Sequence, residues 1–94
     1  MRFGIFTSMG NTTWANVLDL WRNLEATGWD IACVTDHFMP NTKDREGTTL
    51  EGWSTLAALS ALVPRLRVGT IVLGNTYRNP AVVAKMAAQV DIIS

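Results

Sequence analysis

Three short apolar runs, each followed by a segment with the spacing of an amphipathic helix, most constrain the fold of this chain. The runs cover residues 2–7, 31–35 and 67–73 and consist mainly of Ile, Val, Phe and small residues. Such runs are typical of strands in a buried sheet. Strands that alternate with helices pair in parallel through right-handed crossovers. The sequence therefore predicts the order β-α-β-α-β-α and a parallel three-stranded sheet.

Capping residues define the first predicted helix. Apolar residues recur at three- and four-residue steps from Trp14 to Thr27, and Thr12 or Thr13 can cap the start. Gly28 follows, where many helices end in a left-handed residue. We therefore expect a helix that begins after the two threonines and ends before this glycine.

The second and third helices carry their own boundary signals. Thr48 and Glu51 have the spacing of a capping box, and Pro64 ends the second helix. Asn79 is a good N-cap, and Pro80 suits the first helical position. Core positions are expected at Trp14, Trp21, Trp53, Cys33 and the third strand, which should be buried on both faces, and at a stripe of Val83, Met86, Ala87, Val90 and Ile93.

Three such units with helices on one face leave the other face of the sheet uncovered. In a closed barrel that second face is the packed interior, and we expect Phe3 or Ile5 to fill it. The prediction is an α/β fold, a partial (βα)8 barrel in which residues 1–94 supply the first three βα units. Helices on both faces of the sheet would contradict it.

Composition limits the classes of partner. Eight Lys and Arg balance eight Asp and Glu, so no electrostatic reason exists to expect nucleic acid or an anionic membrane, and a small-molecule substrate is favoured. There is neither a membrane-length apolar stretch nor a signal-like start, and one cysteine cannot form an intramolecular disulfide, so we expect a cytoplasmic protein. The 48% hydrophobic content exceeds what a small domain easily hides, which indicates further chain or a partner.

Polar side chains follow each predicted strand, where ligands of parallel α/β proteins bind. Asp36 and His37, the chain's only histidine, follow the second strand and precede a long polar loop at 41–47. Gly74 and Asn75 follow the third strand and are candidate ligand contacts, although any turn needs such residues. No metal site is expected, because no second cluster of metal-ligating residues accompanies Asp36 and His37. Weaker candidates for contact are Thr7 and Ser8.

Three segments together resemble one family: residues 28–38, which contain Asp-His-Phe, residues 68–73, and residues 77–85, which contain Asn-Pro-Ala. The chain resembles the bacterial luciferase-like monooxygenases, particularly the branch that uses the deazaflavin coenzyme F420. The resemblance covers essentially the whole chain. It implies a flavin- or deazaflavin-dependent oxidoreductase or monooxygenase with F420 as cofactor, or FMN as the alternative, and specificity loops on later strands.

The resemblance also implies roles for particular residues. Asp36 and His37 would lie near the reactive ring as catalytic residues, with Asp36 orienting the imidazole or contacting the cofactor. An imidazole can take up the proton that hydride transfer from an alcohol leaves behind near neutral pH. The alternative is a purely structural role, in which His37 ends a strand and hydrogen-bonds the backbone. Asn75 is a further candidate cofactor contact because of its position after the third strand. The resemblance implies another at a cis peptide between Ile71 and Val72, for which an ordinary buried strand is the alternative.

Two functions from different classes remain open at this point. Residues 1–94 can be the N-terminal portion of a working barrel enzyme, in which case the isolated chain is expected to be inactive. Alternatively, they form a non-catalytic truncated fragment that self-associates, as a homo-oligomer, or assembles with the remainder of a barrel. Such a fragment would make either contact, with a second copy or with the remainder of a barrel, through the uncovered apolar face of the sheet.

Overall fold

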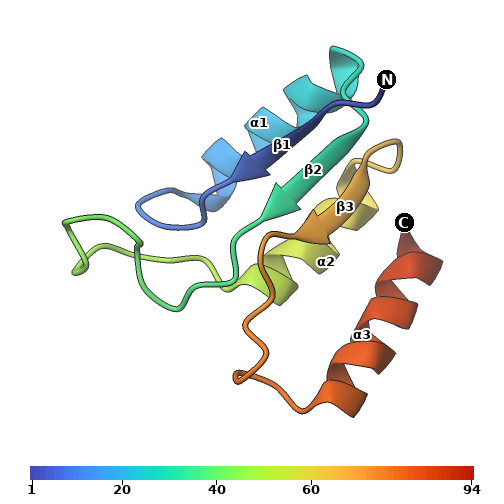
Figure 1. Cartoon of the computed structure of the whole chain (residues 1–94). Helices are drawn as coiled ribbons and strands as arrows, with labels where there is room; N and C mark the ends of the chain where they lie inside the picture. Colours follow the sequence, from blue (N-terminus) through green and yellow to red (C-terminus); the bar gives the residue numbers. More distant parts are fainter.

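The computed structural model describes all 94 residues and has the element order that the sequence predicts (Figure 1). The three strands form one parallel sheet in the order β1-β2-β3, with Ile5 opposite Ala32 and Ala32 opposite Val68. The elements are β1 (Gly4–Thr7), α1 (Trp14–Ala26), β2 (Ile31–Val34), α2 (Gly52–Leu62), β3 (Arg67–Thr70) and α3 (Pro80–Ile93).

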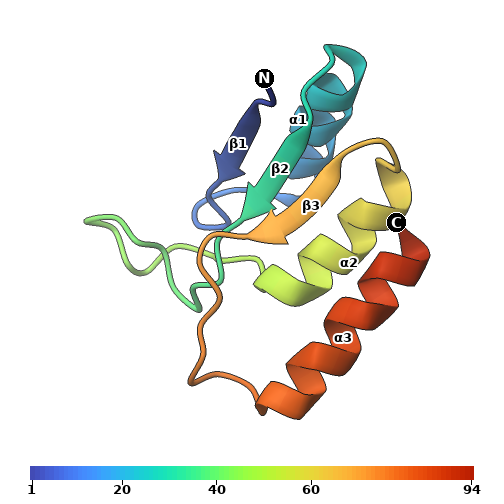
Figure 2. The same ribbon diagram turned by 45° about the vertical axis from the view of Figure 1, so that its right-hand side comes forward.

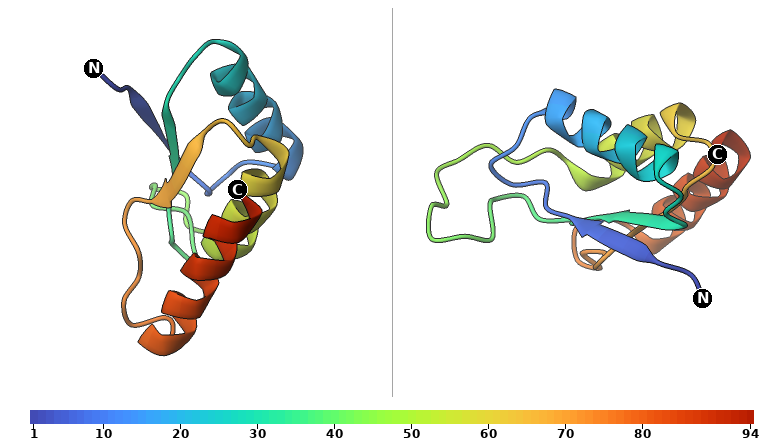
Figure 3. Two further views of the ribbon diagram at one scale, coloured as in Figure 1. Left: turned by 90° about the vertical axis from the view of Figure 1, so that its right-hand side faces the viewer. Right: turned by 90° about the horizontal axis from the view of Figure 1, so that it is seen from above.

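The helices all lie on one side of the sheet, and the other side is bare, as both views of Figure 3 show. This arrangement confirms the prediction of one-sided βα units. The core lies between the sheet and α1 and α2, where apolar side chains of both layers interlock. Its members are Met9, Val17, Trp21, Leu24, Ala32, Val34, Trp53, Leu56, Leu59, Val63 and Leu66.

The side-chain phase of β1 is opposite to the one expected. Ile5 packs against the core, and the buried Thr7 accepts a 3.1 Å hydrogen bond from the indole Nε1 of Trp21 in α1. Because side chains alternate along a strand, Phe6 points to the bare face instead, and it is exposed. The expectation that Ile5 fills a barrel interior was therefore wrong, and Phe3, which precedes β1, is exposed.

Two of the three helix starts are as predicted. Thr13 caps α1 by accepting the Asn16 N–H, and Asn79 caps α3 ahead of Pro80. The first helix ends before Gly28, which has a positive φ of 84°. Helix α2 likewise stops before Pro64, and its C-cap is Val63.

The capping box predicted at the start of α2 was wrong. Glu51 is itself the N-cap, and its carboxylate accepts the N–H groups of Trp53 and Ser54. Thr48 instead lies in the preceding loop, where its carbonyl accepts the Asn11 N–H at 2.8 Å. The loop that enters α2 is thus tied to the β1–α1 connection rather than wound into the helix.

The last strand and helix are less buried than expected. β3 is only partly covered, because neither a neighbouring strand nor a second layer lies beyond it, so full burial on both faces was wrong. No residue of α3 is buried; only Val83, Met86 and Val90 of its stripe pack on the core, while Ala87 and Ile93 are exposed. Figure 2 shows α3 beside α2 and apart from β3.

A cavity of about 570 Å³ separates β3 from α3, with residues 67–70, Trp53 and Val90 among its lining. Trp21 and Trp53 are core residues as predicted, whereas Trp14 is 38% exposed. None of the helices has both the length and the apolar character that crossing a membrane requires.

Candidate functional site

The carboxyl ends of the three strands meet at one edge of the sheet. Beyond the regular ladder, the Thr35 N–H donates to the Thr7 carbonyl at 3.2 Å, and the Ile71 N–H donates to the Val34 carbonyl at 2.9 Å. The segments that follow β2 and β3 are therefore fixed side by side. The structure thus brings Asp36, which follows β2, to the segment that holds Ile71.

His37 is half-buried beside the buried Asp36. None of the side-chain hydrogen bonds or ion pairs of the structure involves its imidazole, and no loop hydrogen bond uses its backbone. The alternative of a purely structural role, in which His37 hydrogen-bonds the backbone, has no support among the hydrogen bonds of the structure.

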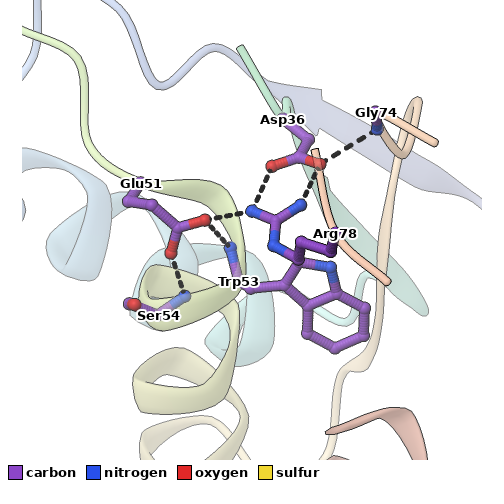
Figure 4. A network of polar contacts seen from close by, with 6 residues as sticks. All are labelled: Asp36, Glu51, Trp53, Ser54, Gly74 and Arg78. Carbon is purple, nitrogen blue, oxygen red and sulfur yellow. Dashed lines mark hydrogen bonds and ion pairs between the residues drawn. The ribbon is translucent and has the colours of Figure 1, made fainter. Parts of the chain in front are cut away.

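Asp36 is the centre of a polar network, shown in Figure 4. Its side chain is fully buried and receives a two-pronged ion pair from Arg78, with Nη1–Oδ2 at 2.6 Å and Nη2–Oδ1 at 2.9 Å. Oδ2 also accepts the Gly74 N–H at 3.0 Å. Both oxygens of this carboxylate are therefore engaged within the chain.

Glu51 joins the same network from the start of α2. One of its carboxylate oxygens accepts a hydrogen bond from the Nη2 of Arg78 and another from the Trp53 N–H, and the other oxygen accepts the Ser54 N–H at 2.7 Å. Arg78 thus lies between two carboxylates, one fully buried and one partly exposed. A planar guanidinium is suited to this task because its donors form a rigid fork.

The network determines the charge state of its members. Burial by itself raises the pKa of Asp36, but the hydrogen bonds from Arg78 and Gly74 outweigh it and hold that pKa below its usual range. The same competition, with the helix N–H groups of Ser54 and Trp53, lowers the pKa of Glu51. The hydrogen bond to Asp36 raises the pKa of Arg78. All three groups are therefore ionised at neutral pH.

The peptide bond between Ile71 and Val72 is cis, as the resemblance implied. It follows β3 directly, and the two side chains are 50% and 69% exposed. Together with Phe6 on the bare face, they present apolar surface at the carboxyl edge of the sheet. A flat apolar ring could lie against such a surface.

The other predicted contacts are placed differently. Asn75 lines a small cavity of about 250 Å³ with Arg78 and Pro80, at the start of α3. The Thr7 hydroxyl is used by Trp21, so it faces the helices rather than the bare face. Nowhere do three or more His, Cys, Asp or Glu side chains gather in a way that could hold a metal ion.

Sequence reasoning missed three participants, namely Arg78, Glu51 and Tyr77. The Tyr77 ring stacks on Phe38 with centroids 4.1 Å apart, which joins the segments after β2 and β3 a second time. The one available signal was Asp36 itself, because a carboxylate at the end of a buried strand needs a cation nearby. Its partner is 42 positions away, and no local pattern identifies it.

Comparison with known proteins agrees with this geometry. The chain is 40% identical over 65 residues to an F420-dependent glucose-6-phosphate dehydrogenase of Nocardia farcinica (strain IFM 10152), a stretch that covers 68% of this chain and 19% of that protein. Its fold matches a solved F420-dependent secondary alcohol dehydrogenase in complex with an F420-acetone adduct with a TM-score of 0.78 and 26% identity, over 90% of this chain and 26% of that one. The family model for luciferase-like monooxygenases matches residues 1–94. The chain therefore belongs to the luciferase-like monooxygenase family.

Proposed function

We propose that residues 1–94 are the N-terminal part of a (βα)8 barrel oxidoreductase that uses coenzyme F420, with FMN as the alternative cofactor, and acts on a small molecule. One observation carries the proposal: the unbonded imidazole of His37 and the exposed Ile71–Val72 pair occupy the same edge of the sheet. The likeness to two F420-dependent enzymes supports the choice of cofactor.

The residues present suit a flat, partly apolar cofactor. Ile71 and Val72 offer exposed apolar side chains next to a bare sheet face, and Phe6 extends that surface across β1. Asn75 lines the separate small cavity at the start of α3, and it stays a proposed polar contact only because it follows β3. Asp36 is expected to support the site without touching the cofactor, because hydrogen bonds from Arg78 and Gly74 already occupy both of its carboxylate oxygens.

The exposed side chains of Ile71 and Val72 would hold a deazaflavin, which would supply the acceptor for the substrate's hydride. His37 accepts at an imidazole nitrogen the hydroxyl proton that an alcohol loses as its carbon becomes a carbonyl carbon. Because neither ring nitrogen of the imidazole has a hydrogen-bond partner in the chain, either one can accept the hydroxyl proton. Asp36 keeps its negative charge beside this ring, because the hydrogen bonds from Arg78 and Gly74 hold the pKa of its carboxyl below the usual range.

The test replaces His37 with Ala in the natural polypeptide that carries this sequence. Alcohol oxidation with oxidised F420 should fall by about 10²- to 10⁴-fold, while the affinity for the cofactor changes far less. Arg22→Ala, an exposed change on α1, serves as the matched control and should keep full turnover. Unchanged turnover in the His37 variant would remove this residue from catalysis.

Spectral titration separates the two cofactors. The natural polypeptide should shift the absorbance of F420 at lower concentrations than it requires for FMN. Saturable binding of FMN without binding of F420 would transfer the proposal to flavin chemistry, whereas binding of neither would refute the cofactor assignment.

The bare face favours a second function, assembly with other polypeptide chains. Phe6, Ile71 and Val72 are at least half exposed there, an arrangement rarely left open to water. The isolated 94-residue chain should therefore self-associate or bind the remainder of a barrel, without activity of its own. Light scattering decides this, since a stable, monodisperse monomer contradicts it.

A further inference from the structure

One guanidinium connects the three segments that build the candidate site. Arg78 contacts Asp36, which immediately precedes His37, and Glu51, which caps the start of α2 (Figure 4). Through Asp36 it also reaches Gly74, whose N–H shares Oδ2 with Nη1. The segments after β2 and β3 and the start of α2 thus meet at a single side chain.

The contacts form a closed ring rather than a chain. Gly74 donates to Asp36, the Tyr77 N–H donates back to the Gly74 carbonyl at 3.1 Å, and Arg78 follows Tyr77 and returns to Asp36. A side chain at Gly74 would begin 2.4 Å from the Tyr77 ring, so the turn is as tight as glycine allows. The ring leaves the segment between Gly74 and Arg78 little freedom relative to Asp36.

We propose that Arg78 is a positioning residue, which fixes the imidazole of His37 relative to the Ile71–Val72 peptide. The proposal rests on the proposed function, because it assigns those two groups to one bound cofactor and substrate. The side chain of Arg78 is mostly buried, and it acts through Asp36 and Gly74. Its fork binds both Asp36 oxygens at once, a geometry that the single ammonium of lysine cannot reproduce.

Stability alone accounts poorly for such an arrangement. Burying a carboxylate and a guanidinium together is costly, and apolar residues of similar size commonly replace buried pairs without loss of stability. A buried, directional ion pair does, however, select one arrangement of the segments that it joins. Here those segments carry His37 on one side and Ile71 and Val72 on the other.

The experiment compares four forms of the natural polypeptide: the unchanged protein, Arg78→Lys, the double variant Arg78→Met with Asp36→Asn, and Arg65→Met. The double variant leaves no unpaired charge at Asp36, so it should fold and melt close to the unchanged protein. Arg65 forms an exposed ion pair with Glu25 and is the matched control. The first readout is the dissociation constant of oxidised F420, followed by its own fluorescence.

Arg78→Lys and the double variant should each bind F420 roughly tenfold more weakly, while Arg65→Met binds it normally. Because Arg78→Lys keeps the positive charge, its melting temperature should stay closer to that of the unchanged protein than its affinity for F420 does. Equal affinity in the lysine variant or in the double variant would overturn the positioning role.

The second readout does not depend on the cofactor. Amide hydrogen exchange should speed up together in residues 35–40 and 71–77 of the lysine variant, and in neither segment of Arg65→Met. If the unchanged protein fails to bind F420, the proposed function falls while exchange still decides the role of Arg78. Unchanged exchange in both segments would overturn the positioning role by itself.

Discussion

Two arginines make ion pairs at opposite ends of the sheet, and they differ in almost every physical respect. Arg78, at the carboxyl end, is 14% exposed and forms a two-pronged pair with a fully buried Asp36. Arg65, at the amino end, is 73% exposed and has its Nε 3.9 Å from Glu25. The contrast teaches that the residue type alone does not give an ion pair its importance; burial of the partner does.

The largest expected effect comes from breaking the buried pair on one side only. Arg78→Met leaves the Asp36 carboxylate buried without a cation, which should lower the free energy of unfolding by about 3 to 5 kcal/mol. Urea unfolding followed by tryptophan fluorescence measures it. A loss below that of the exposed pair would mean that water reaches Asp36 in the variant and the contrast is false.

The next effect tests how closely α2 packs on the network. A Cβ at Gly52 would lie 2.8 Å from the Thr35 carbonyl oxygen and 2.9 Å from Oδ1 of Asp36. Gly52→Ala should therefore cost about 1 to 3 kcal/mol in the same unfolding experiment, because backbone cannot yield as a flexible side chain does. The control is Gly69→Ala, whose Cβ would meet only the Cys33 sulfur at an ordinary 3.6 Å.

A smaller effect is expected from acid. The pKa values of Asp36 and Glu51 are lower in the folded protein than in the unfolded chain, where they are about 3.9 and 4.3. Their contribution to stability is thus complete only above both unfolded values, from about pH 5, and is lost as the pH falls through the folded values. Melting temperatures between pH 7 and pH 3 should drop at the acid end. The Arg78→Met, Asp36→Asn double variant should show a shallower drop, and an equally steep one would contradict the assignment.

The smallest effect is expected at the exposed pair. Arg65→Met removes only the side-chain interactions with Glu25, while the Arg65 N–H still donates to that carboxylate at 2.8 Å. The change in unfolding free energy should stay below about 1 kcal/mol and shrink further in salt. A loss as large as that of Arg78→Met would erase the contrast between the two ends.

Local signals were sufficient for most of the fold. Thr13, Asn79 and Gly28 mark helix ends through contacts within a few residues, so their roles can be predicted from neighbours alone. The phase of β1 could not, because Ile5 and Phe6 are both apolar and either could face the helices. In the structure, the observed phase places Thr7 where it accepts a hydrogen bond from Trp21, a contact between the sheet and α1 that the local sequence does not reveal.

The site divides in the same way. His37 and Asp36 could be singled out because they follow a recognisable strand, and the resemblance identified the Ile71–Val72 peptide. Glu51 was assigned to a capping box, since its second role requires Arg78, which lies 27 positions further along. Pairings over such distances leave no periodic trace in one sequence, so they emerge only from the folded chain.

The gap between β3 and α3 has a dynamic consequence. Because α3 has no buried residue and rests on α2 rather than on the sheet, it should be the first element to open in thermal fluctuations. The ion-paired Arg78 stands immediately before Asn79 and Pro80, where that helix begins. We therefore expect opening of α3 to stop at Arg78, whose ion pair with Asp36 holds the segment before the helix in place.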